Sequence, residues 1–360
     1  MTGQAAVRPG ALATGLFVAS LPVLAREAAR QRDPGLLVEL AAARAVKLSA
    51  GFGSRKWFES RHPEGTDPED YHAAGVRIGE RLADGRFEGT TTMARTVPFD
   101  TKLPLVGTNA VRYLTGCLYA AAGPSKQNGF LVFSWLGFWG QFLHYRAFVV
   151  GVPDGDHRRY RRLVFFTPSL TFWSSILGKE PLMVLSLGTA ALGCARTFER
   201  SARSGAMLVA LGGAGAVVIR PHVVSVLGKG LLADLEEQAA LTANGSAAFT
   251  PARPRGAVGL GQIVATVLFR PFPHEARNAS AMLAAAEGLA MLLLWVDRAR
   301  GALPSSASPS RRPYVPVAAF AAGGLTALLG GVANFGVLNR QRAPLLPFLF
   351  VLLCSRPRGR

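Results

Sequence analysis

The sequence predicts an all-α, polytopic transmembrane helix bundle of about nine to eleven helices, some of them short or broken by proline. The chain has 360 residues, of which 49% are hydrophobic and only 17% are charged, whereas a soluble protein spends about 25% on charge. That small charged set is basic, with 40 Lys and Arg against 22 Asp and Glu and a formal net charge of +18. High hydrophobicity excludes disorder, and the scattering of basic residues between apolar runs argues against a nucleic-acid partner. The expected partner is a lipid bilayer, and the expected location is the cell (plasma) membrane.

Apolar runs that approach the length of a membrane span, about 20 residues, recur along the chain. The clearest is 128–150, and 279–296 and 314–333 follow it in length. Shorter runs are 11–25, 162–177, 181–196, 205–219, 257–270 and 343–354, and two charged, weaker stretches are 36–53 and 222–233. The first run also matches a cleavable signal peptide, since Arg8 precedes it and small residues end it. We favour a retained helix because arginines follow this run directly.

The positive-inside rule sets the orientation of these helices. The arginine-rich segments are 151–161, 196–204, 297–312 and 355–360. With these segments in the cytoplasm, the N-terminus lies outside, the C-terminus lies inside, and the hairpins between them turn on the outer side. The resulting regions are N-terminal transmembrane helices over 1–53, an extracytoplasmic loop with interfacial amphipathic helices over 54–127, a transmembrane bundle over 128–354 and a basic cytoplasmic tail over 355–360.

Every outer hairpin turn carries ionisable residues, which the positive-inside rule would not place there. In chain order they are Lys179, Glu180, Arg220, His222, Arg270, His274, Glu275, Arg340 and Arg342. Charges at membrane depth cost about 2.5–3.5 kcal/mol each on insertion scales unless they are paired or face water. Two structural interpretations are that Lys179 and Glu180 neutralise each other and that the arginines extend to the headgroups. The functional interpretation is a cationic outer cavity for phosphate or diphosphate, which arginine binds bidentately. Its phosphate-binding residues would be Lys179, Arg220, Arg270, Arg340 and Arg342.

The long outer loop adds acidic residues at Asp67 and Asp70, followed by His72. One of these carboxylates, or Glu180, is a candidate general base beside the cationic cavity. The alternative for the two aspartates is a solvated loop with a helix N-cap at one of them. His72, His222, His274 and Glu275 are secondary candidates. No metal is expected, because the histidines and acids lack a local ligand spacing and no C-x-x-C motif occurs. No cofactor is indicated, and no G-x-x-x-x-G-K-[ST] motif predicts ATP hydrolysis.

Two sets of motifs resemble known membrane enzymes. The pattern Asp67-x-x-x-Tyr71-His72-x-x-Gly75, followed by Leu82-x-x-Gly85-x-Phe87, resembles the first extracytoplasmic loop of GT-C-type polyprenyl-phosphate-sugar-dependent glycosyltransferases. The run from Phe166 to Glu180, with later segments at 220–222, 270–275 and 334–347, resembles bacterial exopolysaccharide and O-antigen polymerase-like proteins.

The sequence departs from these families in two helices that carry charges. Lys229, Asp234, Glu236 and Glu237 follow His222, and Glu39, Arg44 and Lys47 lie within 36–53. One explanation is that these helices tilt and line water. The other is that this copy has lost its activity.

The resemblance implies an enzyme of cell-envelope or extracellular polysaccharide biosynthesis. It would transfer or polymerise glycan on the outer face from a polyprenyl-(di)phosphate-linked sugar, in an envelope-synthesis complex. The cationic residues would stabilise the leaving phosphate, and Asp67, Asp70 or Glu180 would take the acceptor proton. The alternative is a transporter or flippase-like protein with the same clusters as an anionic path; its broken helices are present, but no repeat between the halves is evident. A structural subunit is a third possibility.

Overall fold

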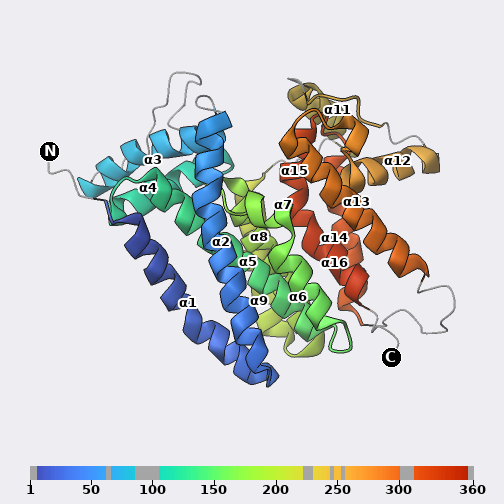
Figure 1. The fold of residues 1–360 in the computed structure, drawn as a ribbon, viewed down its shortest axis with the longest axis horizontal. Coiled ribbons are helices and arrows are strands. Elements are labelled where there is room, and N and C mark those ends of the chain that lie inside the picture. Colours follow the sequence, from blue (N-terminus) through green and yellow to red (C-terminus); the bar gives the residue numbers. More distant parts are fainter. Residues whose placement is uncertain are drawn as a thin grey trace. The chain divides into compact units, whose positions relative to one another are not determined.

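The computed structural model is built from helices (Figure 1). It describes residues 6–61, 66–85, 105–221, 230–243, 247–252, 256–300 and 312–355. Over these ranges the backbone forms no strand, and a single isolated bridge joins Ala248 to Asn334. The predicted all-α fold class is therefore confirmed.

Five helices of the described chain are long and apolar enough to cross a membrane. They are α1 (Pro9–Gln31), α8 (Lys179–Glu199), α9 (Ala202–Ile219), α13 (Ala279–Arg300) and a continuous segment, Phe335–Cys354. This last segment consists of α15 (Phe335–Arg342), a 3-10 turn (Ala343–Leu345) and α16 (Leu346–Cys354). Two shorter apolar helices are α12 (Gly256–Phe269) and α14 (Tyr314–Leu329). Large apolar side chains on these helices are exposed, such as Leu293 and Phe320, which suits contact with lipid.

The helix α5 (Lys126–Gly151) covers the run that the sequence marks as the clearest span, but it is not one of those five. Polar side chains along it, including Gln141, His144 and Arg146, lower its hydropathy, and all three are buried. Glycines on α5 allow other backbone to approach closely: a Cβ on Gly137 would lie 2.0 Å from the carbonyl oxygen of Ser174. Close approach through small residues is typical of packed membrane helices. This helix is thus an interior element of the fold.

The chain divides into two compact units. Unit 1 comprises 1–140, 171–186 and 214–221. Within it, α1 packs on α2 (Pro34–Arg61), and α3 (Asp67–Ala83) packs on α4 (Thr108–Ala122). The second helix continues well beyond residue 53, where the sequence analysis ends it.

The contact between α3 and α4 is close because glycines lie in it. A Cβ on Gly116 would meet Cγ2 of Ile78 at 2.3 Å. Val111, Thr115 and Tyr119 form the buried face of α4. Leu114 of the same helix is apolar but exposed. Apolar spacing alone did not reveal that glycine and threonine make the closest contact.

Unit 2 comprises 141–170, 187–213 and 222–360. Its helices include α6 (His157–Phe166), α11 (Leu231–Thr242) and the apolar helices α12 to α16. Among these, α16 packs against α6 and α14, and α12 packs against α13 and α14.

The helix expected over 162–177 is interrupted at Pro168. α6 ends at Phe166, Thr167 has an extended backbone, and α7 (Pro168–Trp173) starts at the proline. Proline has no backbone N–H and pushes the preceding residue out of the helical conformation, so the break has a local cause. Residues 174–178 then form a non-helical segment before α8, which we call the α7–α8 connector.

Candidate functional site

Glu180 and Arg220 form a buried ion pair in unit 1. Glu180 lies in the first turn of α8, and Arg220 follows the end of α9. Nη2 of Arg220 donates to Oε1 of Glu180 at 3.1 Å, and the side chains of Arg220 and Glu180 are only 9% and 1% exposed. Arg220 is therefore turned inward and does not extend to the headgroups. The structure brings together one predicted base and one predicted phosphate-binding residue.

The α7–α8 connector places buried, non-helical backbone immediately before this pair. Ser174, Ser175 and the apolar residues after them are buried. Non-helical backbone at membrane depth is tolerated only where protein encloses it or a water-filled cavity borders it. Side chains from two other helices contact the connector: Oγ of Ser54 donates to the carbonyl of Ser175 at 3.4 Å, and Oγ of Ser134 lies 3.3 Å from Oγ of Ser175.

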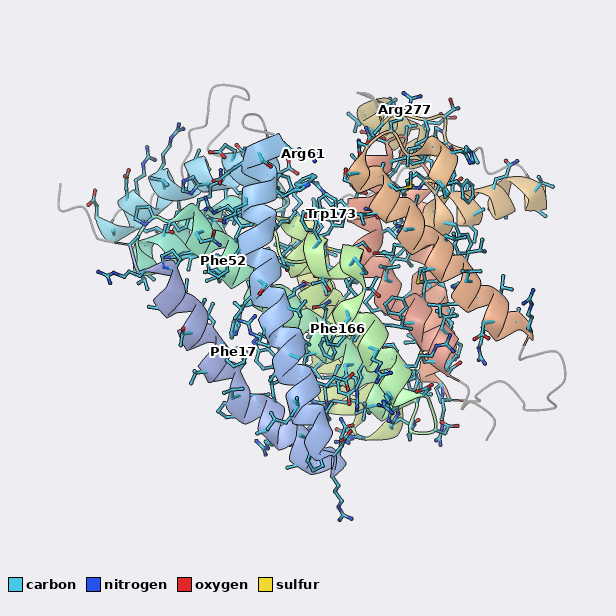
Figure 2. All side chains as sticks on the ribbon, viewed as in Figure 1. Phe17, Phe52, Arg61, Phe166, Trp173 and Arg277 are labelled. Atoms are coloured by element: carbon cyan, nitrogen blue, oxygen red, sulfur yellow. The ribbon has the colours of Figure 1, made fainter. Side chains whose placement is uncertain are left out.

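Aromatic side chains attach α7 to α2. The ring of Trp57 packs edge-on against Phe172 at 5.4 Å and against Trp173 at 6.4 Å. Trp173 is the last residue of α7 (Figure 2). Such pairs contribute about 0.5–1.5 kcal/mol beyond the area they bury. These contacts hold the end of α7, and with it the start of the connector, against α2.

Arg44 and Lys47 of α2 are the charged residues that the sequence analysis noted but did not assign to a site. Both are buried in unit 1. Nζ of Lys47 donates to the carbonyl of Thr171 at 3.0 Å and to Oγ of Ser174. The guanidinium carbon of Arg44 lies 5.4 Å from the ring centre of Phe138. The signal that could have placed them was their spacing of three residues, which puts both on one face of a helix.

The two acidic residues of the outer loop are both in the first turn of α3. Asp70 accepts hydrogen bonds from Arg112, with Nη2 at 2.7 Å and Nε at 3.0 Å from Oδ2. Asp67 is the first residue of α3 and Thr66 is the N-cap, so neither aspartate is the N-cap considered above. Acidic residues in this first turn stabilise the positive end of the helix dipole. Asp70 and Glu180 are thus both paired with an arginine, but the side chain of Asp70 is 32% exposed and that of Glu180 only 1%, so Glu180 is the more buried of the two candidate bases.

His72 makes a hydrogen bond in which its role as donor or acceptor depends on the tautomer of the ring. Its Nδ1 lies 2.8 Å from the hydroxyl of Tyr119. Burial lowers the pKa of His72 from its ordinary value of 6.5; Glu69 opposes this effect, and Lys126 adds to it. The unfolded chain therefore binds more protons than the folded chain just below this ordinary value, and stability is lost as the pH falls through that range.

We expect amide hydrogen exchange in α3 and α4 to be several-fold faster at pH 5.5 than at pH 7.5, after correction for intrinsic rates. His72→Gln removes the titrating group and should make corrected exchange nearly independent of pH. An equal acceleration at pH 5.5 in the wild type and His72→Gln would contradict the assignment.

Unit 2 contains a second charged cluster around Arg270. Nε of Arg270 donates to Oε1 of Glu275 at 3.0 Å, and its guanidinium carbon lies 4.8 Å and 4.9 Å from the ring centres of Phe249 and Phe335. Burial by itself would raise the pKa of Glu275, but hydrogen bonds from Arg270 and the amide of Phe272 lower it below its usual range. Arg270 is consequently held by internal partners.

Arg342 closes the end of α12. Its Nη1 donates to the carbonyls of Leu268 at 3.0 Å and Arg270 at 3.3 Å, and its Nη2 donates to Asn339 at 2.8 Å. A basic side chain on terminal helix carbonyls is a capping arrangement.

The remaining predicted residues divide between the units. Lys179 begins α8 in unit 1. Arg340 lies on α15 in unit 2, and His274 stacks on Phe272 at 5.9 Å in the same unit. His222 lies outside the described residues. Unit 1 thus holds Asp67, Asp70, His72, Lys179, Glu180 and Arg220, whereas unit 2 holds Arg270, His274, Glu275, Arg340 and Arg342.

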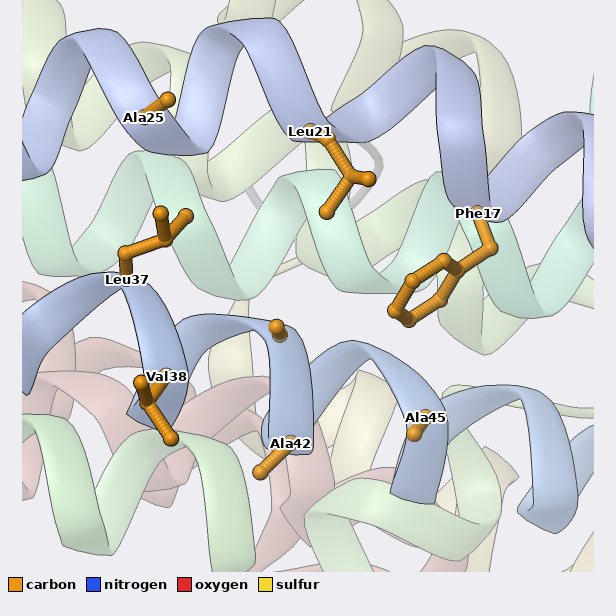
Figure 3. A pocket seen from close by; sticks show the side chains of 8 residues that line it. Phe17, Leu21, Ala25, Leu37, Val38, Ala42 and Ala45 are labelled. Atoms are coloured by element: carbon orange, nitrogen blue, oxygen red, sulfur yellow. The ribbon is translucent and has the colours of Figure 1, made fainter.

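An apolar groove runs between α1 and α2 in unit 1 (Figure 3). Its volume is about 590 Å³. Eight apolar side chains line it: Phe17, Leu21, Ala25, Leu37, Val38, Ala41, Ala42 and Ala45.

Comparison with protein-family models, with curated proteins and with solved structures gives no match for this chain. Within the described residues, no group of three or more His, Cys, Asp or Glu side chains is arranged to hold a metal ion. The class that the fold and the site define is a polytopic helical membrane protein with buried charged groups.

Proposed function

We propose that the protein is a plasma-membrane enzyme of cell-envelope or extracellular polysaccharide biosynthesis, acting in an envelope-synthesis complex. It transfers or polymerises sugar from a polyprenyl-(di)phosphate carrier. The observation that carries this proposal is the buried Glu180–Arg220 pair beside the α7–α8 connector. Ionisable residues inside a membrane bundle are expensive to bury and mark functional sites by default. The resemblance of the segment from Phe166 to Glu180 to polysaccharide polymerases adds the reaction class.

The reaction needs a base and a stabilised leaving group. Glu180 would accept the proton of the acceptor hydroxyl while the oxygen of that hydroxyl forms a bond to the anomeric carbon of the sugar. The bond between that carbon and the carrier phosphate breaks, and the phosphate leaves with the bonding electrons. Arg220 holds the Glu180 carboxylate in place, and Lys179 beside it supplies positive charge for the departing phosphate.

A transporter or flippase-like protein for an anionic or lipid-linked substrate is the second candidate. The α7–α8 connector favours it, because discontinuous helices with buried non-helical backbone form the substrate sites of many transporters. The charged pair would then line an anionic path and perform no bond chemistry.

A reconstituted system separates these functions. Full-length protein in liposomes receives a polyprenyl-diphosphate sugar and an acceptor glycan; mass spectrometry detects new glycosidic bonds, and an impermeant reagent reports movement between leaflets. We expect new bonds with the wild type, and a rate lowered at least about 100-fold in Glu180→Gln, which keeps the size of the side chain and loses the base.

Glu59→Gln is the matched control, because Glu59 is exposed, pairs with Arg55 and Lys126, and should leave turnover unchanged. Leaflet movement without new bonds would assign the transporter function. If the wild type gives neither new bonds nor leaflet movement, both functions are refuted.

A further inference from the structure

We propose that Arg44 and Lys47 form an anion site inside unit 1, which takes the phosphate or diphosphate group of a lipid whose hydrocarbon chain lies in the α1–α2 groove. The inference rests on the proposed function for the identity of that lipid. It adds a phosphate contact in the interior of α2, because Arg220 at the hairpin turn is already paired with Glu180.

Arg44 and Lys47 carry an unbalanced charge. Arg44 is 0% exposed and Lys47 is 1% exposed. Within the described residues neither forms an ion pair, and the partners of Lys47 are a carbonyl and a hydroxyl, which are neutral. Two adjacent buried cations without a counter-charge are strongly disfavoured. An anion between them removes that cost.

Arg44 and Lys47 also have hydrogen-bond donors without a partner. Nε, Nη1 and Nη2 of Arg44 are buried and have no hydrogen-bond partner. Lys47 uses two of the three donors of its ammonium group on Thr171 and Ser174. Buried polar groups in native proteins are almost always satisfied, so these orphaned donors call for a ligand. A guanidinium fork next to an ammonium group matches the oxygens of a phosphate.

The α1–α2 groove takes the hydrocarbon chain of the lipid. The groove side of α2 includes Ala41 and Ala45, and a helix turns through about 100° per residue. Arg44 therefore projects between the groove side and the buried side that carries Lys47. The groove is entirely apolar, and its volume of about 590 Å³ falls within the range of ligand pockets, about 300–1,000 Å³. Arg44 is buried and is not one of the residues that line the groove, so the proposal requires the phosphate end of a lipid seated there to pass from the groove to the neighbouring buried side of α2.

The test measures lipid retention by the full-length protein. The protein is reconstituted in phosphatidylcholine nanodiscs with or without polyprenyl phosphate, and native mass spectrometry records the bound lipid. Inorganic diphosphate is the second probe and is followed by the thermal unfolding midpoint. Arg44→Leu with Lys47→Met should weaken polyprenyl phosphate binding roughly 10- to 100-fold, the loss expected for charged hydrogen bonds. Arg55→Leu removes a charge from the same helix and should change binding less than about twofold.

Each outcome decides the proposal. Equal retention of polyprenyl phosphate by the double variant and the wild type overturns it. Stabilisation of the wild type by inorganic diphosphate, without preferential retention of polyprenyl phosphate, also overturns it. Apolar replacement of buried charges is usually tolerated. If the double variant does not fold, two single variants replace it. Lys47→Arg keeps the charge and must still bind polyprenyl phosphate, whereas Arg44→Gln must lose this binding. Glu180→Gln should bind the lipid normally, so failure of glycan transfer and failure of this site give different results.

Discussion

Arg220→Ala is expected to lower the free energy of unfolding by about 3–5 kcal/mol, the range for removing one partner of a buried ion pair. The substitution leaves the carboxylate of Glu180, whose side chain is 1% exposed, without the guanidinium that faces it at 3.1 Å. Reversible denaturation of the purified protein in detergent micelles, or the thermal midpoint where unfolding is irreversible, measures the loss.

Two comparisons isolate this pair from a general loss of packing. Arg112→Ala breaks the pair with Asp70, whose side chain is 32% exposed, so it should cost only about 1 kcal/mol. Glu180→Gln combined with Arg220→Met removes both charges together and should cost less than Arg220→Ala alone. If Arg220→Ala were no more damaging than Arg112→Ala, the Glu180–Arg220 contact would carry little of the stability of unit 1.

This prediction also changes how surface-glycan phenotypes are to be interpreted. The simplest test of a phosphate-binding arginine is its replacement by alanine, but both Arg220 and Arg270 have internal carboxylate partners. Under the proposed function, their alanine variants would lose glycan through misfolding whether or not they bind phosphate. Glu180→Gln, which keeps a polar group facing Arg220, is the more informative variant for chemistry.

The helical membrane fold could be predicted from the sequence because hydropathy needs only local information. The partner of Glu180 could not, since Arg220 is 40 residues away and the adjacent Lys179 offered a simpler counter-charge. Hydrophobic runs give the positions of helices and leave open which charges meet after the helices pack. The same limit applies to Arg44 and Lys47. The sequence shows them only as charges in a weakly apolar helix, and it does not show that α5 and the connector enclose them.

Other differences had local causes that the sequence contained. Pro168 lies within the run 162–177, and its effect on the preceding residue accounts for the end of α6. Gln141, His144 and Arg146 lie within the longest apolar run, and their burial gives α5 an interior role. In both cases the run was judged by its apolar content, whereas its polar residues and its proline determined the structure.

Gly137→Ala is expected to destabilise unit 1 by about 1–3 kcal/mol or more, as overpacking does in a tight interior. The added Cβ would lie 2.0 Å from the carbonyl oxygen of Ser174, and backbone cannot turn aside as a flexible side chain can. α5 and the α7–α8 connector must therefore move apart. That movement strains the contacts of Lys47 with Ser174 and of Ser134 with Ser175.

Gly53→Ala is the matched control, because Gly53 lies on α2 in the same unit and its Cβ would meet nothing within 4 Å. Alanine there should stabilise the helix by about 0.5–1 kcal/mol through the lower entropy of the unfolded chain. The same substitution should thus change the free energy of unfolding in opposite directions at the two glycines, and denaturation of the two variants measures this directly.

A stabilised Gly137→Ala protein would mean that α5 does not approach the connector closely. The enclosure of Lys47 by the connector and α5 would then fail, and with it the burial on which the anion site depends.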